Sequence, residues 1–297
     1  MSLFLIRYGE LGLKSPKVKM RFQRMLKENI EDAFLSEDTQ CITSMDWGRI
    51  YIHTDNDAIA KEILRKTFGI TSFSEVIEIT SDLNEICRTA SEYSKQIIPE
   101  NSTFAVRARR TGEHKFTSQD VAKEVGTAIL SANKEKNIKV NLSEPDTKIF
   151  VEVRHNRAFI FSEKIRGPGG FPMGTQGKVL ALISDRKSLY AAWLMMKRGC
   201  RTKLLCPDKE SLELANSLEP WELNPKPIST DGENNSLEKA VGMAKKVRAE
   251  ALVLGYTFEE FEKKGKINAD IPIFYPLIGM SKDEIDKKIS FLFGNGS

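Results

Sequence analysis

Basic residues gather on one predicted strand and the turn after it, in a pattern suited to binding a polyanion. In the stretch 103–109, apolar residues alternate with Arg107 and Arg109, so both arginines lie on one face of the strand. The full basic set is Arg107, Arg109, Arg110, His114 and Lys115. Contacts from Lys and Arg to phosphates supply most of the affinity for nucleic acids, and RNA helices are recognised largely by backbone and shape. We therefore expect an RNA-binding surface here; the alternative is that these arginines pair with acidic neighbours.

A second basic stretch lies between positions 7 and 27, where Glu10 is the only acidic residue. Its candidates for RNA binding are Arg7, Lys14, Lys17, Lys19 and Arg21. Residues 1–207 carry 33 Lys+Arg against 25 Asp+Glu, whereas residues 208–297 carry 12 against 16. This asymmetry favours a nucleic-acid partner for the first part of the chain, although a solvated helix face is the alternative.

The cysteines and histidines form no metal-binding or disulfide pattern. The four cysteines include no CxxC pair, and the chain has only three histidines. We therefore expect neither a disulfide scaffold nor a metal site. Cys206 follows a predicted strand at the edge where open α/β sheets place ligands, which makes it a candidate reactive thiol. The alternative is an inert buried cysteine.

The length of 297 residues, with 40% apolar and 29% charged residues, fits two or three globular domains. No stretch approaches the roughly 18 apolar residues that a membrane span requires. The first ten residues lack the basic segment and the cleavage site of a secretory signal. We expect a cytoplasmic protein.

The spacing of apolar residues predicts the elements that position these side chains. In the first 80 residues, it predicts helices over 17–34 and 57–68 and strands over 3–8, 41–45, 49–53 and 74–79. This β-α-β-β-α-β order is ferredoxin-like. In residues 81–165, it predicts helices over 82–97 and from Ser118 or Asp120 to Ala132, and strands over 103–109, 148–153 and 158–161.

A glycine- and proline-rich connector, GPGGFPMGTQG, occupies residues 167–177. Beyond it, predicted strands cover 178–183, 203–205, 227–229, 251–255 and 271–274. Helical patterns lie between them, notably at 187–198 and 237–247. Strands that alternate with helices indicate a parallel α/β sheet.

Four segments together carry a resemblance to a known family. They are RYGELGLKS (7–15), FAVRARRTGEHKFTSQDVAKEVGTAI (104–129), FSEKIRGPGGFPMGTQGKVLALIS with LMMKRG (161–184 and 194–199), and PLIGMSKDEI (276–285). The chain resembles the tRNA sulfurtransferases that make 4-thiouridine and serve thiamine biosynthesis. The resemblance implies an α+β part followed by an α/β part, in three domains joined by the linker at 167–177. They are a ferredoxin-like domain (1–80), an RNA-binding THUMP domain (81–166) and a Rossmann-like parallel-sheet domain of ATP-pyrophosphatase type (178–297).

The resemblance also implies partners and cofactors. Proteins of this family are thought to bind the acceptor stem and 3′ end of tRNA with the first two domains, and dimers are usual among them. A sulfur carrier or sulfurtransferase would be a further partner. ATP with Mg would be the cofactor if the third domain still functions. If it does not, we assign no cofactor.

The sequence departs from the family where the catalytic loop should lie. The family has a loop of SGGxDS type, whose glycines let backbone N–H groups approach a phosphate. The equivalent segment is Ser184, Asp185, Arg186, Lys187 and Ser188, one residue shorter and without glycine. Asp185 brings a negative charge where a phosphate would bind. We therefore expect a degenerate nucleotide loop, in which Asp185 or Ser188 is a helix N-cap.

Two further family features are altered. In the TGES-like motif Gly255 is kept, but Tyr256 takes the acidic position. The family's catalytic cysteine follows the PLIGM segment, and neither it nor a rhodanese-like extension is found in residues 1–297. We therefore assign no catalytic residue.

Three hypotheses remain open from the sequence. The first is a tRNA-binding protein with an impaired or lost adenylation site. The second is an active ATP-dependent tRNA sulfurtransferase that uses an external sulfur donor. The third is a small-anion sensor, with Arg186 and Lys187 at a helix N-terminus.

Overall fold

The computed structural model describes residues 1–9, 15–46, 48–222, 226–230, 237–265 and 267–294. The chain divides into two compact units. Unit 1 comprises Met1–Arg7, Cys41–Asp57 and Ser72–Ile165, and unit 2 comprises Tyr8–Gln40, Ala58–Thr71 and Arg166–Ser297. The three domain boundaries inferred above remain predictions. Among the described residues, no helix has the length and apolar character needed to cross a membrane.

Unit 1 is built on a long mixed sheet. Its strands are β1 (Ser2–Tyr8), β2 (Ile42–Asp46), β3 (Arg49–Thr54), β4 (Ile70–Thr80), β5 (Thr103–Thr111), β6 (Lys139–Val140), β7 (Thr147–Arg154) and β8 (Arg157–Phe161). They run in the order β2-β3-β1-β4-β8-β7-β5-β6, and β9 (Ile165–Arg166) pairs with β4. Strands β5 and β7 are parallel, whereas β7 and β8 are antiparallel. The alternation of apolar residues predicted strands in these segments, and the structure pairs each of them with a neighbouring strand.

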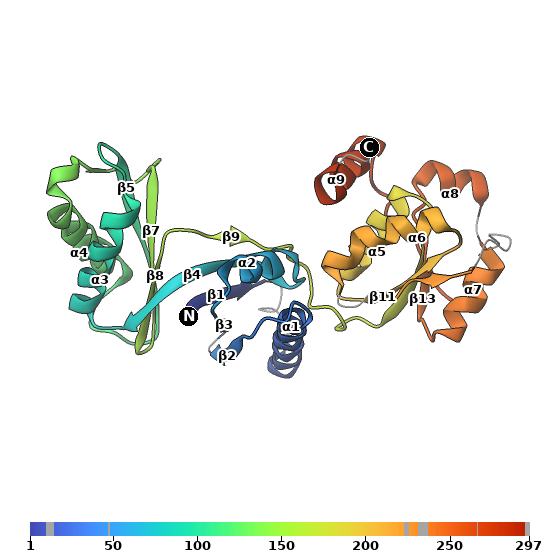
Figure 1. Cartoon of the computed structure of the whole chain (residues 1–297), viewed down its shortest axis with the longest axis horizontal. Coiled ribbons are helices and arrows are strands. Elements are labelled where there is room, and N and C mark those ends of the chain that lie inside the picture. The colour runs from blue at the N-terminus through green and yellow to red at the C-terminus, as the bar shows by residue number, and fades with distance from the viewer. Residues whose placement is uncertain (10–14, 47, 223–225, 231–236, 266, 295–297) are drawn as a thin grey trace. The chain divides into compact units, whose positions relative to one another are not determined.

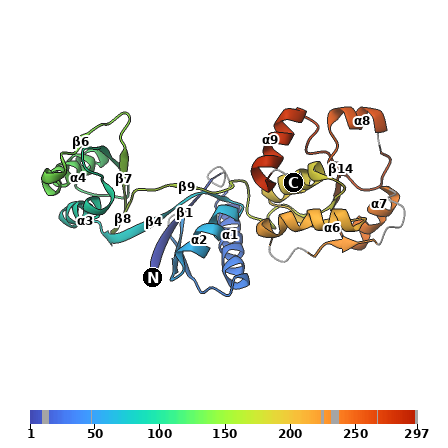
Figure 2. The same cartoon turned by 45° about the horizontal axis from the view of Figure 1, so that its top comes forward.

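Helices α3 (Leu83–Ile97) and α4 (Ser118–Ala132) cover one face of β5, β7 and β8 (Figures 1 and 2). Apolar side chains at every second strand position join those of the helices in one core, which includes Phe104, Ile149, Val151 and Ile160. The side chains between them lie on the opposite face of the sheet because successive residues of a strand point to opposite sides. That opposite face carries the arginines of β5.

Unit 2 contains a parallel sheet of five strands. They are β10 (Lys178–Leu182), β11 (Arg201–Cys206), β12 (Ile228–Ser229), β13 (Ala251–Val253) and β14 (Ile273–Phe274), in the order β12-β11-β10-β13-β14. The chain moves outward from β10 on one side and then returns to add β13 on the other. In open α/β sheets of this kind, ligands bind at the carboxyl ends of the strands where the order reverses. Here that point lies between β10 and β13.

Helices cover both faces of this sheet. They are α5 (Arg186–Lys197), α6 (Lys209–Ala215), α7 (Leu237–Lys246), α8 (Phe258–Lys264) and α9 (Lys282–Phe293). Val179 and Ala181 of β10 share a core with α5, α6 and α9, whereas Leu180 between them packs with α7. A strand that is apolar on both faces is the expected signature of a buried parallel sheet.

Unit 2 also includes the helices α1 (Pro16–Ser36) and α2 (Asp57–Lys66). Aromatic contacts connect them to the connector and to the helices of the parallel sheet. The ring of Phe22 lies edge-on to Phe171, with centroids 5.7 Å apart. Phe68, just after α2, lies 5.5 Å from both Trp193 and Trp221. Edge-to-face and offset-stacked pairs of this kind stabilise by about 1 kcal/mol beyond the area that they bury.

The predicted elements agree with the structure apart from their ends, the two-residue strands β6 and β9, and the helices α6, α8 and α9. Helix α4 begins at Ser118, which is one of the two predicted starts, and Thr117 caps it together with Asp120. Helices α6, α8 and α9 were not predicted individually. The last two begin with capping boxes, formed by Thr257 with Glu260 and by Ser281 with Glu284. These are Ser/Thr-x-x-Glu patterns that sequence alone can reveal.

Candidate nucleic-acid interface and nucleotide-loop region

The face of the unit 1 sheet opposite α3 and α4 concentrates positive charge. We define the basic face as Arg49, Arg107, Arg109, Lys148, Arg154 and Lys164, which line two adjoining hollows of about 490 and 380 Å³. Arg110 of β5 also lines the second hollow. Glu152 is the one carboxylate among the described residues that line either hollow. The field at this face is therefore strongly positive and suited to a polyanion.

Glu152 is neutralised within the protein. Its Oε1 accepts a hydrogen bond from Arg7 Nε at 2.9 Å and forms an ion pair with Arg7 Nη2 at 2.8 Å, and its Oε2 lies 3.6 Å from Arg49 Nη2. The side chains of Glu152 and Arg7 are only 6% and 12% exposed. Burial alone would raise the pKa of Glu152, but the nearby charges of Arg7 and Arg49 outweigh it and hold this pKa below its ordinary value. The buried carboxylate thus tethers β1, β3 and β7, and its charge is balanced by Arg7 and Arg49.

Three other cations of the basic face are exposed. Arg107 and Arg109 are exposed, as is Lys148. Among the described residues, no carboxylate forms an ion pair with Arg107, Arg109 or Arg110; Arg107 and Arg110 donate to the carbonyl oxygens of Leu142 and Gly112 instead. The expectation that acidic neighbours occupy these arginines is therefore not met in the described part of the chain.

Lys164 adds a cation that lies against aromatic rings. Its ammonium is 4.0 Å from the ring centroid of Phe150 and 5.8 Å from that of Phe161. Burial, followed by the charges of Arg7 and Arg109, lowers the pKa of Lys164. A lowered ammonium pKa beside other cations means that a bound anion is favoured electrostatically, because the anion relieves their mutual repulsion.

The structure brings only part of the predicted RNA-binding set together. Arg107, Arg109 and Arg110 share one surface, whereas Arg7 is committed to the buried ion pair with Glu152. In the turn after β5, Lys115 is exposed and the half-buried His114 ring stacks on Phe116 with centroids 5.2 Å apart. Lys17, Lys19 and Arg21 lie in the first turns of α1, in unit 2. Lys14 lies outside the described residues.

Sequence analysis missed Arg49, Lys148, Arg154 and Lys164. Strand β7 runs parallel to β5 and places Phe150 beside Arg107 and Glu152 beside Arg109. The alternation of Lys148, Phe150, Glu152 and Arg154 along β7 was a readable signal for one face. Its pairing with β5 was not readable, because a helix and a short strand separate the two in sequence.

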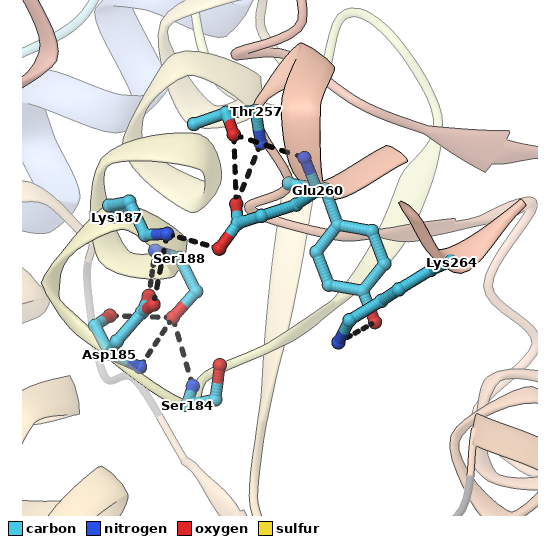
Figure 3. Close-up of polar contacts among 8 residues, drawn as sticks. Ser184, Asp185, Lys187, Ser188, Thr257, Glu260 and Lys264 are labelled. Atoms are coloured by element: carbon cyan, nitrogen blue, oxygen red, sulfur yellow. Dashed lines mark hydrogen bonds and ion pairs between the residues drawn. The ribbon is translucent and has the colours of Figure 1, made fainter. Parts of the chain in front are cut away.

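The segment equivalent to the family's phosphate loop is closed by its own hydrogen bonds (Figure 3). The hydroxyl oxygen of Ser188 accepts the backbone N–H groups of Ser184 and Asp185, at 2.9 and 3.0 Å. The Asp185 carboxylate in turn accepts the backbone N–H of Ser188 at 2.8 Å, as the N-cap of α5. The prediction of an N-cap at Asp185 is confirmed. Three backbone donors at this helix end, those of Ser184, Asp185 and Ser188, are thus occupied by side chains.

The two cations of this segment are also engaged. Lys187 lies 2.6 Å from Glu260 of α8 and 3.7 Å from Asp185 (Figure 3). Burial alone would lower the pKa of Lys187, but the hydrogen bond to Glu260 and the charge of Asp185 raise it overall. Arg186 donates to the carbonyl oxygen of Gly294. Neither cation is directed to an external anion in this arrangement.

Gly255, after β13, is required by close packing against α5. A Cβ added there would lie 2.6 Å from Cα and 2.7 Å from the backbone nitrogen of Ser188. Both atoms belong to the backbone and cannot rotate away. The retained glycine therefore brings the carboxyl end of β13 against the start of α5, at the point where the strand order reverses.

Cys206 does not have the surroundings of a reactive thiol. It is fully buried, and burial together with the charge of Asp208 raises its pKa to about 11. The thiolate is the nucleophilic form, so this site suppresses reactivity at neutral pH. Among the described residues, no group of three or more His, Cys, Asp or Glu side chains is placed to hold a metal ion.

Comparison with known protein families matches most of unit 1 and the first helices. Residues 3–74 match the ThiI ferredoxin-like domain, and residues 80–163 match the THUMP domain. A probable tRNA sulfurtransferase of Methanobrevibacter smithii is 43% identical over 202 residues, which cover 66% of this chain and 51% of the relative. The chain thus aligns with about half the length of that relative. One of Methanosarcina acetivorans is 34% identical over 327 aligned positions, covering 96% of this chain and 79% of the relative.

Solved structures share the whole fold. PH1313 from Pyrococcus horikoshii OT3 has a TM-score of 0.83 and 29% identity, over 99% of this chain and all of that one. A 4-thiouridine synthetase, solved as an RNA complex with bound ATP, has a TM-score of 0.76 and 23% identity, over 98% of this chain and 85% of that one. The fold is therefore a ferredoxin-like domain, a THUMP domain and a C-terminal parallel-sheet domain.

Proposed function

Because this chain belongs to the tRNA sulfurtransferase family, we propose that it binds tRNA through the basic face of unit 1. The observation that carries the proposal is the exposed pair Arg107 and Arg109 on the basic face, with the exposed Arg110 next to them at the second hollow. Among the described residues, none of the three forms an ion pair with a carboxylate. The charge of Glu152 is balanced by Arg7 and Arg49, so it does not offset the positive charge of the β5 arginines. Arginine on a rigid strand positions guanidinium groups for phosphate contacts at little entropic cost.

The test is the salt dependence of tRNA binding. Replacing Arg107, Arg109 and Arg110 together by Ala weakens binding and reduces the slope of log K against log salt by up to ~3 units, one for each lost phosphate contact. The matched control replaces Arg88, Lys95 and Lys123, which are exposed on α3 and α4 across the sheet. It removes the same charge and leaves the slope unchanged. Equal effects of the two triple variants would refute the assignment of this face.

We further propose that the third domain has lost the ability to adenylate tRNA by itself. Support comes from the closed loop: Ser188 accepts the backbone N–H groups of Ser184 and Asp185, and the Asp185 carboxylate accepts that of Ser188 at the start of α5. A triphosphate would have to displace these hydrogen bonds and approach a negative charge. Lys187, the nearest cation, is held by Glu260.

The second candidate is an active ATP-dependent tRNA sulfurtransferase that draws sulfur from a separate donor. Family membership and the close approach of Gly255 to Ser188 at the switch point favour it. ATP with Mg would then bind where α5 begins, after Asp185 rotates out of its capping position.

AMP release from labelled ATP, measured with and without unmodified bulk tRNA, separates the two candidates. Formation of AMP that depends on tRNA would establish the second. Absence of AMP, from folded protein that binds tRNA in the salt titration, is the result we expect. Binding of phosphate alone, without effect on tRNA, would favour the third hypothesis of an anion sensor at Arg186 and Lys187.

Partners beyond tRNA follow from the same family. Homodimerisation and docking of a sulfur carrier or sulfurtransferase are part of this proposal, and the acceptor stem and 3′ end are the proposed site on the tRNA. Sedimentation of the chain with and without tRNA tests the dimer. A separate cysteine-persulfide donor added to the AMP assay tests whether a partner completes the reaction.

A further inference from the structure

A pocket of about 440 Å³ in unit 2 is lined by none of the residues that the proposed function uses. It is formed by α1, α2 and the 3₁₀-helix Asn216–Trp221, with Met173 of the connector. Its volume falls within the range of small-molecule sites, which are hollows of roughly 300–1,000 Å³. The pocket therefore has room for a small ligand. The residues that line it indicate which chemical class of ligand would fit.

The floor of this pocket is aromatic. Phe68 is 2% exposed and stacks on Trp221, with ring centroids 5.5 Å apart and planes 26° from parallel. Trp193 lies edge-on to Trp221 at 5.4 Å, behind the lining. Trp221 itself is only half-buried. An indole fixed by two neighbouring rings is a rigid platform, and its negative π-face attracts cations.

The walls are acidic. Glu37, Glu62, Glu219 and Glu222 line the pocket, with Lys66 as the one basic residue among the described lining. Three of these carboxylates are exposed at the rim. This charge is opposite to that of the basic face, so the pocket and the basic face suit ligands of opposite sign.

Glu222 differs from the other three carboxylates because it is partly buried. Its Oε2 is buried and has no hydrogen-bond partner in the described part of the chain. Burial raises the pKa of Glu222 to about 7, while the charges of Lys203 and Arg201 on β11 hold it lower than burial alone would. A buried carboxylate without a partner costs free energy that a bound cation would recover.

We propose that this pocket binds a small organic cation, with its ammonium or guanidinium group at Glu222 and its apolar body against Trp221. The carboxylates supply charge complementarity, the indole supplies a cation–π surface, and Ile59 and Ile63 of the pocket supply apolar contact.

Three probes of similar shape and different charge test the proposal by calorimetry at pH 8, where Glu222 is largely ionised. They are benzylammonium, benzyl alcohol and benzoate. Benzylammonium binds at least about tenfold more tightly than benzyl alcohol, and benzoate binds most weakly, because only the first is complementary to the carboxylates. Equal binding of benzylammonium and benzyl alcohol, or no binding of benzylammonium to the folded chain, would overturn the proposal.

Substitutions locate the binding. Glu222→Gln keeps the shape of the side chain and removes its charge, and it lowers the affinity for benzylammonium about tenfold. Glu238→Gln, on the exposed surface of α7, removes the same charge outside the pocket and leaves affinity unchanged. Lys66→Glu strengthens binding, because it removes the one opposing charge in the lining. Indistinguishable affinities for Glu222→Gln and Glu238→Gln, with thermal unfolding showing both folded, would also overturn it.

Discussion

Asp185 and Ser188 cap each other across the first turn of α5. The Asp185 carboxylate accepts the Ser188 backbone N–H at 2.8 Å, and the Ser188 hydroxyl oxygen accepts the Asp185 backbone N–H at 3.0 Å. Each residue thereby satisfies a donor that a helix N-terminus otherwise leaves open. In the family's phosphate loop such donors face the nucleotide. This chain uses them for its own stability.

Replacing Asp185 by Ala is therefore expected to lower the free energy of unfolding by about 1 kcal/mol, the usual contribution of an N-cap. Asp185→Asn keeps a capping oxygen without the charge and should cost much less. Urea denaturation of the three proteins measures the difference. Equal losses from the two substitutions would mean that charge, and not capping, is what Asp185 contributes.

The close approach of Gly255 to Ser188 predicts a steric cost. Gly255→Ala places a methyl group 2.6 Å from a backbone atom, so one strand end or helix start has to move. We expect a loss of about 1–3 kcal/mol, as for an overpacked core. Gly242→Ala, in α7, is the control, because nothing lies within 4 Å of its added Cβ. In a helix that change is stabilising by up to about 1 kcal/mol. Opposite shifts in melting temperature are the signature to look for.

Glu152 carries the strongest prediction for unit 1. Glu152→Gln leaves Arg7 and Arg49 buried without a counter-charge, and should cost about 3 kcal/mol. Glu78→Gln breaks the ion pair with Arg157, in which each side chain is roughly 30% exposed. It should lower the free energy of unfolding by less than about 1 kcal/mol. Denaturant midpoints of both variants decide whether the Glu152 pair is as buried in solution as it is here.

The same carboxylate predicts acid sensitivity. The pKa of Glu152 is lower in the folded chain than its ordinary value of 4.5, so the unfolded chain binds the proton more readily. Its contribution to stability is present above pH 4.5 and is lost as the pH falls through the folded-state pKa. Unfolding free energies measured from pH 6 downward should fall less steeply for Glu152→Gln than for the unsubstituted chain.

Glu222 predicts the opposite pH dependence. Its pKa is raised to about 7, so the folded chain holds the proton more tightly than the unfolded chain. Stability from this group is complete below pH 4.5 and is lost as the pH rises through about 7. Glu222→Gln should thus be neutral near pH 4.5 and stabilising at pH 8, by at most about 3 kcal/mol. A variant that is equally stable relative to the parent at both pH values would contradict this.

Local sequence patterns alone predicted several features of this protein. Alternation along 103–109 put Arg107 and Arg109 on one face, and the loss of glycine from 184–188 indicated a helix cap at Asp185. These inferences succeed because strand periodicity and capping depend on residues a few positions apart. The family resemblance rests on longer ordered segments of the same local kind.

Only the tertiary structure decided which charges remain available. Arg7 and Arg107 are equally basic in sequence, yet Arg7 is buried against Glu152, 145 positions away, and Arg107 is exposed. Likewise, the pairing of β5 with β7 adds Lys148 to the basic face, and the meeting of α1, α2 and Trp221 creates the acidic pocket. Such contacts depend on which strands and helices pack together. The free energy of that packing comes from burial of whole apolar faces, and it leaves no short-range mark on the charged residues that it brings together.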